Sequence, residues 1–162
     1  VDPGDLVVNA GVAPLLHHLA FSLFDAGDTV LTLGPYYPAF DYDLNVQAEV
    51  ELTPVIGDKS DEEITTRFLE KAMAEAVAAG KRVRGLLVTT PTNPTGQLLS
   101  VDEIEAAAAF AEKYGLHLIS DEVYSLSVHA PGEAHLSLAH VRPDLGPRRH
   151  ILWGLSKDLC MS

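Results

Sequence analysis

Apolar residues along the chain fall into two patterns: stretches in which they recur with helical spacing, and short runs of consecutive aliphatic and β-branched residues between those stretches. From Val12 to Ala26 they recur three and four residues apart, while Pro14 suits a first helical turn and Gly27 suits the left-handed residue beyond a helix end, so we predict a helix. Two further helices are predicted where a serine precedes a glutamate by three residues, the pattern of a capping box: Ser60 with Glu63, for a helix through Ala79, and Ser100 with Glu103, for a helix ending before Gly115.

Short runs of aliphatic and β-branched residues between these helices predict strands, at residues 29–33, 49–54, 83–89, 116–120 and 150–153. Residues 40–47 predict a short helix, and residues 129–149, rich in Pro, Gly and His, predict a long connection. Strands that alternate with helices form crossover units. The fold class is therefore predicted as α/β, with a mostly parallel sheet and helices on both faces.

The charge balance narrows the set of partners. The 162 residues include 11 Lys and Arg against 23 Asp and Glu, which gives a net charge of −12 and disfavours nucleic acid, since its phosphates would be repelled. The one cysteine, Cys160, allows no intrachain disulfide, no apolar run approaches the roughly 20 residues that span a bilayer, and the N-terminus does not resemble a signal peptide. We therefore expect a cytoplasmic protein that binds neither nucleic acid nor membrane.

Polar side chains follow four of the predicted strands where each ends: Tyr36 and Tyr37, Asn93, Asp121, and Lys157. In open α/β sheets, ligands bind beyond the carboxyl ends of the strands, so parallel neighbours would bring these side chains to one rim. Taken singly, each residue also fits an ordinary structural role, as a turn former, a helix cap or a surface lysine. The seven histidines show no metal-ligand spacing, and we predict no metal site.

Four ordered motifs give the chain a specific resemblance. They are Pro35–Leu44 (PYYPAFDYDL), Thr92–Gly96 (TNPTG), Ile119–Tyr124 (ISDEVY) and Leu155–Leu159 (LSKDL). Together they resemble the large domain of the pyridoxal-phosphate-dependent aminotransferase class I/II family (fold type I), in particular its 1-aminocyclopropane-1-carboxylate synthase-like branch. The resemblance implies that residues 1–162 are an incomplete cofactor-binding large domain, with the small domain and a C-terminal part outside this stretch.

The family's site residues carry over onto matching positions. Lys157 would form the Schiff base with pyridoxal 5'-phosphate and later act as the general base at the substrate Cα. Asp121 would keep the pyridine nitrogen protonated, Asn93 and Tyr124 would hydrogen-bond the phenolic oxygen, and Tyr37, rather than its neighbour Tyr36, would stack on the ring.

The phosphate-binding residues depart from the family pattern. The resemblance implies that the start of the first helix, at Val12 and Ala13, and Ser156 would bind the phosphate, but Gly154 replaces one hydroxyl of the family's S-x-S-K, and the matching arginine would lie beyond Ser162. We therefore expect the 162-residue chain to bind the cofactor weakly.

The function implied is that of an aminotransferase-like enzyme acting on an α-amino acid, as a homodimer in the full-length protein. Two alternatives stay open. One is a 1-aminocyclopropane-1-carboxylate synthase-type lyase acting on S-adenosylmethionine, because both reactions begin with removal of the Cα proton. The other is a non-catalytic remnant or interaction domain, which the altered phosphate positions favour.

Overall fold

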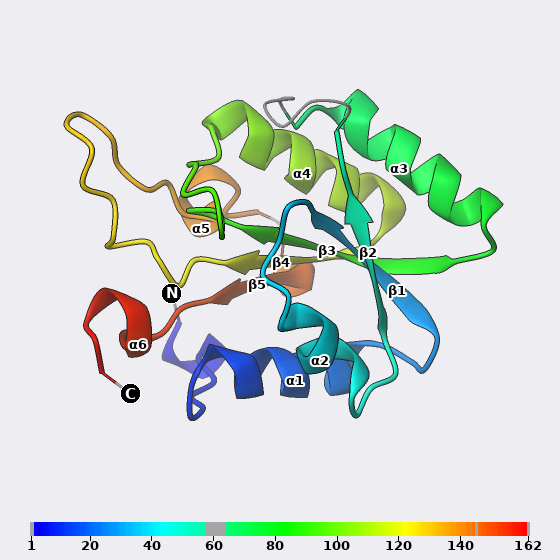
Figure 1. Ribbon diagram of the computed structural model, residues 1–162, viewed down its shortest axis with the longest axis horizontal. Helices are drawn as coiled ribbons and strands as arrows, with labels where there is room; N and C mark the ends of the chain where they lie inside the picture. The colour runs from blue at the N-terminus through cyan, green and yellow to red at the C-terminus, as the bar shows by residue number, and fades with distance from the viewer. Residues whose placement is uncertain (1, 58–63, 145, 162) are drawn as a thin grey trace.

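A five-stranded parallel sheet forms the centre of the protein. The computed structural model describes residues 2–57, 64–144 and 146–161. The strands are β1 (Asp28–Leu33), β2 (Glu51–Val55), β3 (Arg82–Thr89), β4 (His117–Asp121) and β5 (Arg149–Leu152), in the order β2-β1-β3-β4-β5, with each neighbouring pair parallel (Figure 1). The predicted α/β class with a parallel sheet is confirmed.

Helices cover both faces of the sheet, as predicted. Figure 1 shows α1 (Val12–Leu23) and α2 (Phe40–Asn45) on one face, and α3 (Thr66–Ala78), α4 (Val101–Tyr114) and α5 (Leu138–Val141) on the other. A separate apolar cluster fills each side: Leu16, Leu44 and Leu87 belong to one, and Leu69, Leu86 and Phe110 to the other. Burial of both sheet faces explains why consecutive residues in the central strands, such as Leu86, Leu87 and Val88 in β3, are all apolar.

The predicted capping box at the start of α4 is present. The Glu103 backbone N–H donates to Ser100 Oγ at 3.2 Å, and the Ser100 N–H donates to Glu103 Oε2 at 2.8 Å. Gly115 ends the helix with φ of 63°, the left-handed conformation that favours glycine. The other predicted capping box, Ser60 with Glu63, lies outside the described residues. The helix observed in this part of the chain, α3, begins at Thr66, and Thr65 Oγ1 caps it by accepting a hydrogen bond from the Phe68 N–H.

Several predicted boundaries were wrong by a few residues. The first helix ends at Leu23 rather than Ala26, because Phe24 turns to an extended conformation and its ring packs into the apolar cluster beneath α1. The strand predicted at 49–54 begins at Glu51 and ends at Val55. The long connection contains α5 and a 3-10 turn at Gly146–Arg148, both too short to produce a recognisable repeat in the sequence.

Two further short elements complete the chain. A 3-10 turn spans Pro3–Asp5, and the one-turn helix α6 (Leu155–Asp158) follows β5. Within the described ranges, no helix combines the length and the apolar character that a membrane crossing requires.

Candidate active site

The strands bring three of the predicted segments to one edge of the sheet. Thr89 at the end of β3 is in register with Asp121 at the end of β4, and Asp121 is in register with Leu152 at the end of β5. The chain carrying Asn93 follows β3, and the chain carrying Lys157 follows β5. These segments and Asp121 therefore leave the sheet side by side, as the parallel arrangement predicts.

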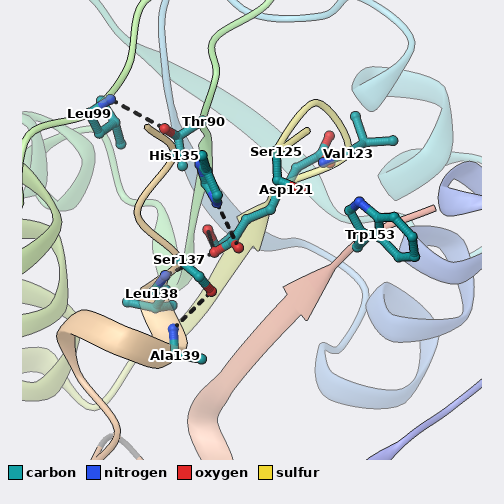
Figure 2. Close-up of polar contacts among 12 residues, drawn as sticks. Thr90, Leu99, Asp121, Val123, Ser125, His135, Ser137, Leu138, Ala139 and Trp153 are labelled. Carbon is teal, nitrogen blue, oxygen red and sulfur yellow. Dashed lines mark hydrogen bonds and ion pairs between the residues drawn. The ribbon is translucent and has the colours of Figure 1, made fainter. Parts of the chain in front are cut away.

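Asp121 is a buried carboxylate at the tip of β4, next to the segment that follows β5 (Figure 2). Its residue is 4% exposed, and Oδ1 accepts a hydrogen bond from the Val123 backbone N–H at 3.2 Å. Among the described residues it forms no ion pair. Burial raises the pKa of Asp121 to about 6, against the opposing effect of the Val123 N–H and with a further contribution from the negative charges of Glu122 and Asp43. A group that is cationic and donates a hydrogen bond would stabilise its ionised form.

Asn93 and Tyr124 approach each other, as binding of one shared oxygen would require. Asn93 Nδ2 donates to the Tyr124 hydroxyl at 3.4 Å, and both side chains are partly buried. Both line a pocket of about 850 Å³. Residues that follow β1, β2 and β3 also line it, so the pocket lies where the strand order reverses between β1 and β3. Such a switch point is the usual ligand site in an open α/β sheet.

The two tyrosines that follow β1 have different surroundings. Tyr36 lines the pocket, and its hydroxyl donates to the Asp41 carboxylate, 3.2 Å from each oxygen. Tyr37 is 44% exposed, does not line the pocket and packs edge-on against Phe40, with ring centroids 5.5 Å apart. The stacking role assigned to Tyr37 stays a prediction.

The first turn of α1 packs directly against the segment that leads to Lys157. A Cβ built on Gly154 would lie 3.1 Å from Val12 Cγ2 and 4.0 Å from Ser156 Oγ. The hydroxyl residue expected at position 154 would therefore crowd Val12, which accounts for the glycine. The backbone N–H groups of Val12 and Ala13 stand in the first helical turn, where they have no intrahelical acceptor and can bind an anion. Gly154 and Val12 are thus a complementary pair, with the small residue facing the larger one.

Lys157 and Ser156 are exposed on α6. Neither residue lines the pocket, and neither do Asp121, Val12 and Ala13. The predicted site residues therefore do not share one pocket: Asn93 and Tyr124 line it, Tyr37 lies outside it after β1, and the others lie around the ends of β4, β5 and α1. The site assignments as a set stay a prediction.

Sequence reasoning missed two polar networks beside the site. The Glu122 carboxylate accepts hydrogen bonds from Ser120 Oγ at 3.0 Å and the Leu138 N–H at 2.9 Å, and pairs with His135 Nε2 at 3.0 Å. The pair is buried, with side chains 8% exposed for His135 and 5% for Glu122. The second network centres on Asp158, the neighbour of Lys157. Within the ranges that the structure describes, no cluster of His, Cys, Asp or Glu is arranged to hold a metal ion.

Comparison with known proteins supports the resemblance seen in the sequence. Residues 1–162 match the family described as Aminotransferase class I and II. The chain is 39% identical over 162 residues to the probable aminotransferase ACS12 of Arabidopsis thaliana, a match that covers 98% of this chain and 32% of that protein. It is 38% identical over 172 residues to the 1-aminocyclopropane-1-carboxylate synthase 3 of Oryza sativa subsp. japonica, covering 98% of this chain and 38% of that protein.

The fold also matches a solved aminotransferase. A tetra mutant of the Thermus thermophilus aspartate aminotransferase has a TM-score of 0.84 and 25% sequence identity, and the match covers 99% of this chain and 41% of that chain. The chain spans about a third of the length of the curated relatives it matches. The predicted family, its 1-aminocyclopropane-1-carboxylate synthase-like branch and the fold type I architecture are confirmed. The chain belongs to the aminotransferase class I and II family.

Proposed function

We propose that this chain is the cofactor-binding part of a pyridoxal-phosphate-dependent enzyme that acts on an α-amino acid, with aminotransferase-like chemistry. The observation that carries the proposal is Asp121, a buried carboxylate without an ionic partner among the described residues, beside the segment of Lys157. A protonated pyridine nitrogen is the kind of group that would satisfy it. When bound, the cofactor supplies an electron sink for the pair of electrons left at the substrate Cα.

Each residue would have a distinct role around the cofactor. Lys157 would hold the cofactor through Nζ and, when free, move a proton at the substrate Cα. Asp121 would hold the proton on the ring nitrogen. Asn93 and Tyr124 would bind the phenolic oxygen, and the Tyr37 ring would cover one face of the cofactor.

The phosphate would be bound at the junction of α1 and α6. The N–H groups of Val12 and Ala13 and the hydroxyl of Ser156 are the candidate donors, supported by the contact of Gly154 with Val12. Because Gly154 replaces one hydroxyl residue, we expect the 162-residue chain to bind the cofactor weakly. This expectation stays a prediction.

The test is a titration of the chain with pyridoxal 5'-phosphate, followed by visible absorbance. We expect a band that the Lys157→Ala variant loses. The matched control is Lys113→Ala, which removes a lysine of α4 that pairs with Glu70 of α3. Equal spectra for the two variants would contradict the proposal. A band that both variants keep would show that it reports non-selective reaction with lysines.

A lyase reaction on S-adenosylmethionine is the second candidate, favoured by the 38% identity to a protein named as a 1-aminocyclopropane-1-carboxylate synthase. Incubation with amino donors and a keto acid, and separately with S-adenosylmethionine, separates the two reactions. A non-catalytic remnant is the third candidate, and it predicts no Lys157-dependent absorbance. We also propose a homodimer and a cytoplasmic location for the whole protein; the family membership supports the first, and the second stays a prediction.

A further inference from the structure

The carboxylate of Asp158, directly after Lys157, accepts four hydrogen bonds from two separate segments. From the turn after β4, Oδ1 accepts from Ser127 Oγ at 2.7 Å, and Oδ2 accepts from the Leu126 N–H at 3.0 Å and from Ser125 Oγ at 3.3 Å. From the end of β5, the Trp153 indole N–H donates to Oδ2 at 2.9 Å. Figure 2 shows Ser125 and Trp153 on these two segments, beyond neighbouring strands.

The donors hold the carboxylate in its ionised form. Burial opposes ionisation of Asp158, but the hydrogen bonds from Leu126, Ser127, Trp153 and Ser125 together hold its pKa below the ordinary value. Hydrogen bonds to a charged acceptor are stronger than neutral ones. The three contacts from the turn after β4 therefore link it strongly to α6, and the Trp153 contact ties α6 to the end of β5.

The helix that carries Lys157 has little else to hold it. α6 is one turn long, has no buried residue, and its N-cap Gly154 provides no side-chain hydrogen bond. A single turn does not offset its own nucleation cost. Among the described residues, the last backbone hydrogen bond between the β4 and β5 segments is the one from the Glu122 N–H to the Leu152 oxygen, at 2.8 Å, five residues before Lys157. Beyond it, the Asp158 carboxylate makes the side-chain contacts that join them.

The other side of this link is a well-ordered turn. The Ser125 N–H donates to the Glu122 oxygen and the Ser127 N–H donates to the Tyr124 oxygen, each at 2.9 Å. The same turn begins at Asp121 and contains Tyr124, both candidate cofactor-binding residues. Asp158 thus joins the segment of the candidate lysine to the segment that would bind the pyridine ring.

We propose that Asp158 is a positioning residue, which fixes Lys157 relative to Asp121 and Tyr124 by tying α6 to the turn after β4. The inference rests on the proposed function. Asp158 itself touches no reacting atom. Its loss frees α6 to move while the sheet and both apolar clusters stay intact.

Two readouts test the proposal on Asp158→Ala and on the isosteric Asp158→Asn. The chain has one tryptophan, Trp153, so its fluorescence reports the link directly and without cofactor. We expect a shifted emission and greater quenching by acrylamide in both variants. We also expect the dissociation constant for pyridoxal 5'-phosphate, measured by absorbance, to rise about tenfold in Asp158→Ala, the size expected for loss of a charge-assisted hydrogen bond. Far-ultraviolet circular dichroism should match the parent.

Asp144→Ala is the matched control, because Asp144 is also a carboxylate that accepts hydrogen bonds, from Arg142, but it lies away from both segments. It should leave both readouts at the parent values. An unchanged Trp153 signal, or parent-like cofactor affinity in Asp158→Ala, would overturn the positioning role while leaving the proposed function standing. If the parent itself shows no Lys157-dependent absorbance, the proposed function fails and this inference fails with it, even where the Trp153 signal moves.

Discussion

Replacement of Asp121 by asparagine should stabilise the cofactor-free protein, and only at neutral pH. Burial raises the pKa of Asp121 to about 6 from the ordinary value of 3.8. A carboxyl group with a raised pKa in the folded state favours folding while it is protonated. That contribution is lost as the pH rises from the unfolded pKa to the folded pKa. Asparagine carries no charge at any pH, so it avoids this loss.

The magnitude follows from the two pKa values. Each pKa unit is worth about 1.4 kcal/mol, so the full loss is about 3 kcal/mol. The difference in unfolding free energy between Asp121→Asn and the parent should therefore grow by about 2–3 kcal/mol from about pH 4 to about pH 7.5, since the unfolded group is already partly ionised at the lower pH. Comparing the difference at two pH values cancels any pH-independent effect of the substitution.

The assay is urea unfolding of both proteins, without cofactor, across this pH range. A difference that does not change with pH would refute the reasoning, because it would mean that Asp121 is not held in an environment that opposes its charge. Cofactor should reverse the order, since the ionised carboxylate then has a cationic partner that asparagine cannot replace. This reversal would show that Asp121 lowers the stability of the cofactor-free protein and raises that of the cofactor-bound protein.

Two other substitutions test the packing and the buried pair. In Gly85→Ala, the added Cβ would lie 2.9 Å from Phe24 Cζ, so the free energy of unfolding should fall by about 1–3 kcal/mol, measured by urea unfolding; a neutral result would show that the ring yields without cost. In Glu122→Gln, the buried contact with His135 loses its negative charge, and the free energy of unfolding should fall by about 3 kcal/mol at neutral pH. Burial opposes ionisation of Glu122, but its hydrogen bonds, first that from His135, hold its pKa below the ordinary value of 4.5. The loss of stability in Glu122→Gln should therefore shrink as the pH falls below that value. A loss that stays constant with pH would contradict the role of the charge.

The sequence predicted the sheet well, because both of its faces are buried. Within these runs, residues 86–88 and 118–119 are consecutive, apolar and buried, and the alternation of the runs with helices left little choice besides a parallel arrangement. The same logic brought Asn93, Asp121 and Lys157 to one edge, since each follows a strand in that sheet. The identity of the ligand came from the motifs, because spacing alone does not distinguish one ligand from another.

The polar networks could not be predicted from the pattern. Glu122 meets His135 across 13 residues of irregular chain, and Asp158 meets Leu126 across 32 residues, so both contacts depend on how loops fold over the sheet edge. α6 is a single turn, too short for any periodicity. The exchange of a hydroxyl residue for Gly154 was visible in the sequence, but its cause was not, because it depends on the distance to Val12.

Peptide mapping after borohydride reduction tests the central claim most directly. The chain is incubated with pyridoxal 5'-phosphate, reduced, digested and examined by mass spectrometry for the lysine that carries the cofactor. The account predicts that Lys157 is labelled at cofactor concentrations at which the other lysines are not, and that Asp121→Asn weakens this selectivity. Label spread evenly over the lysines, or absent from Lys157, would contradict it.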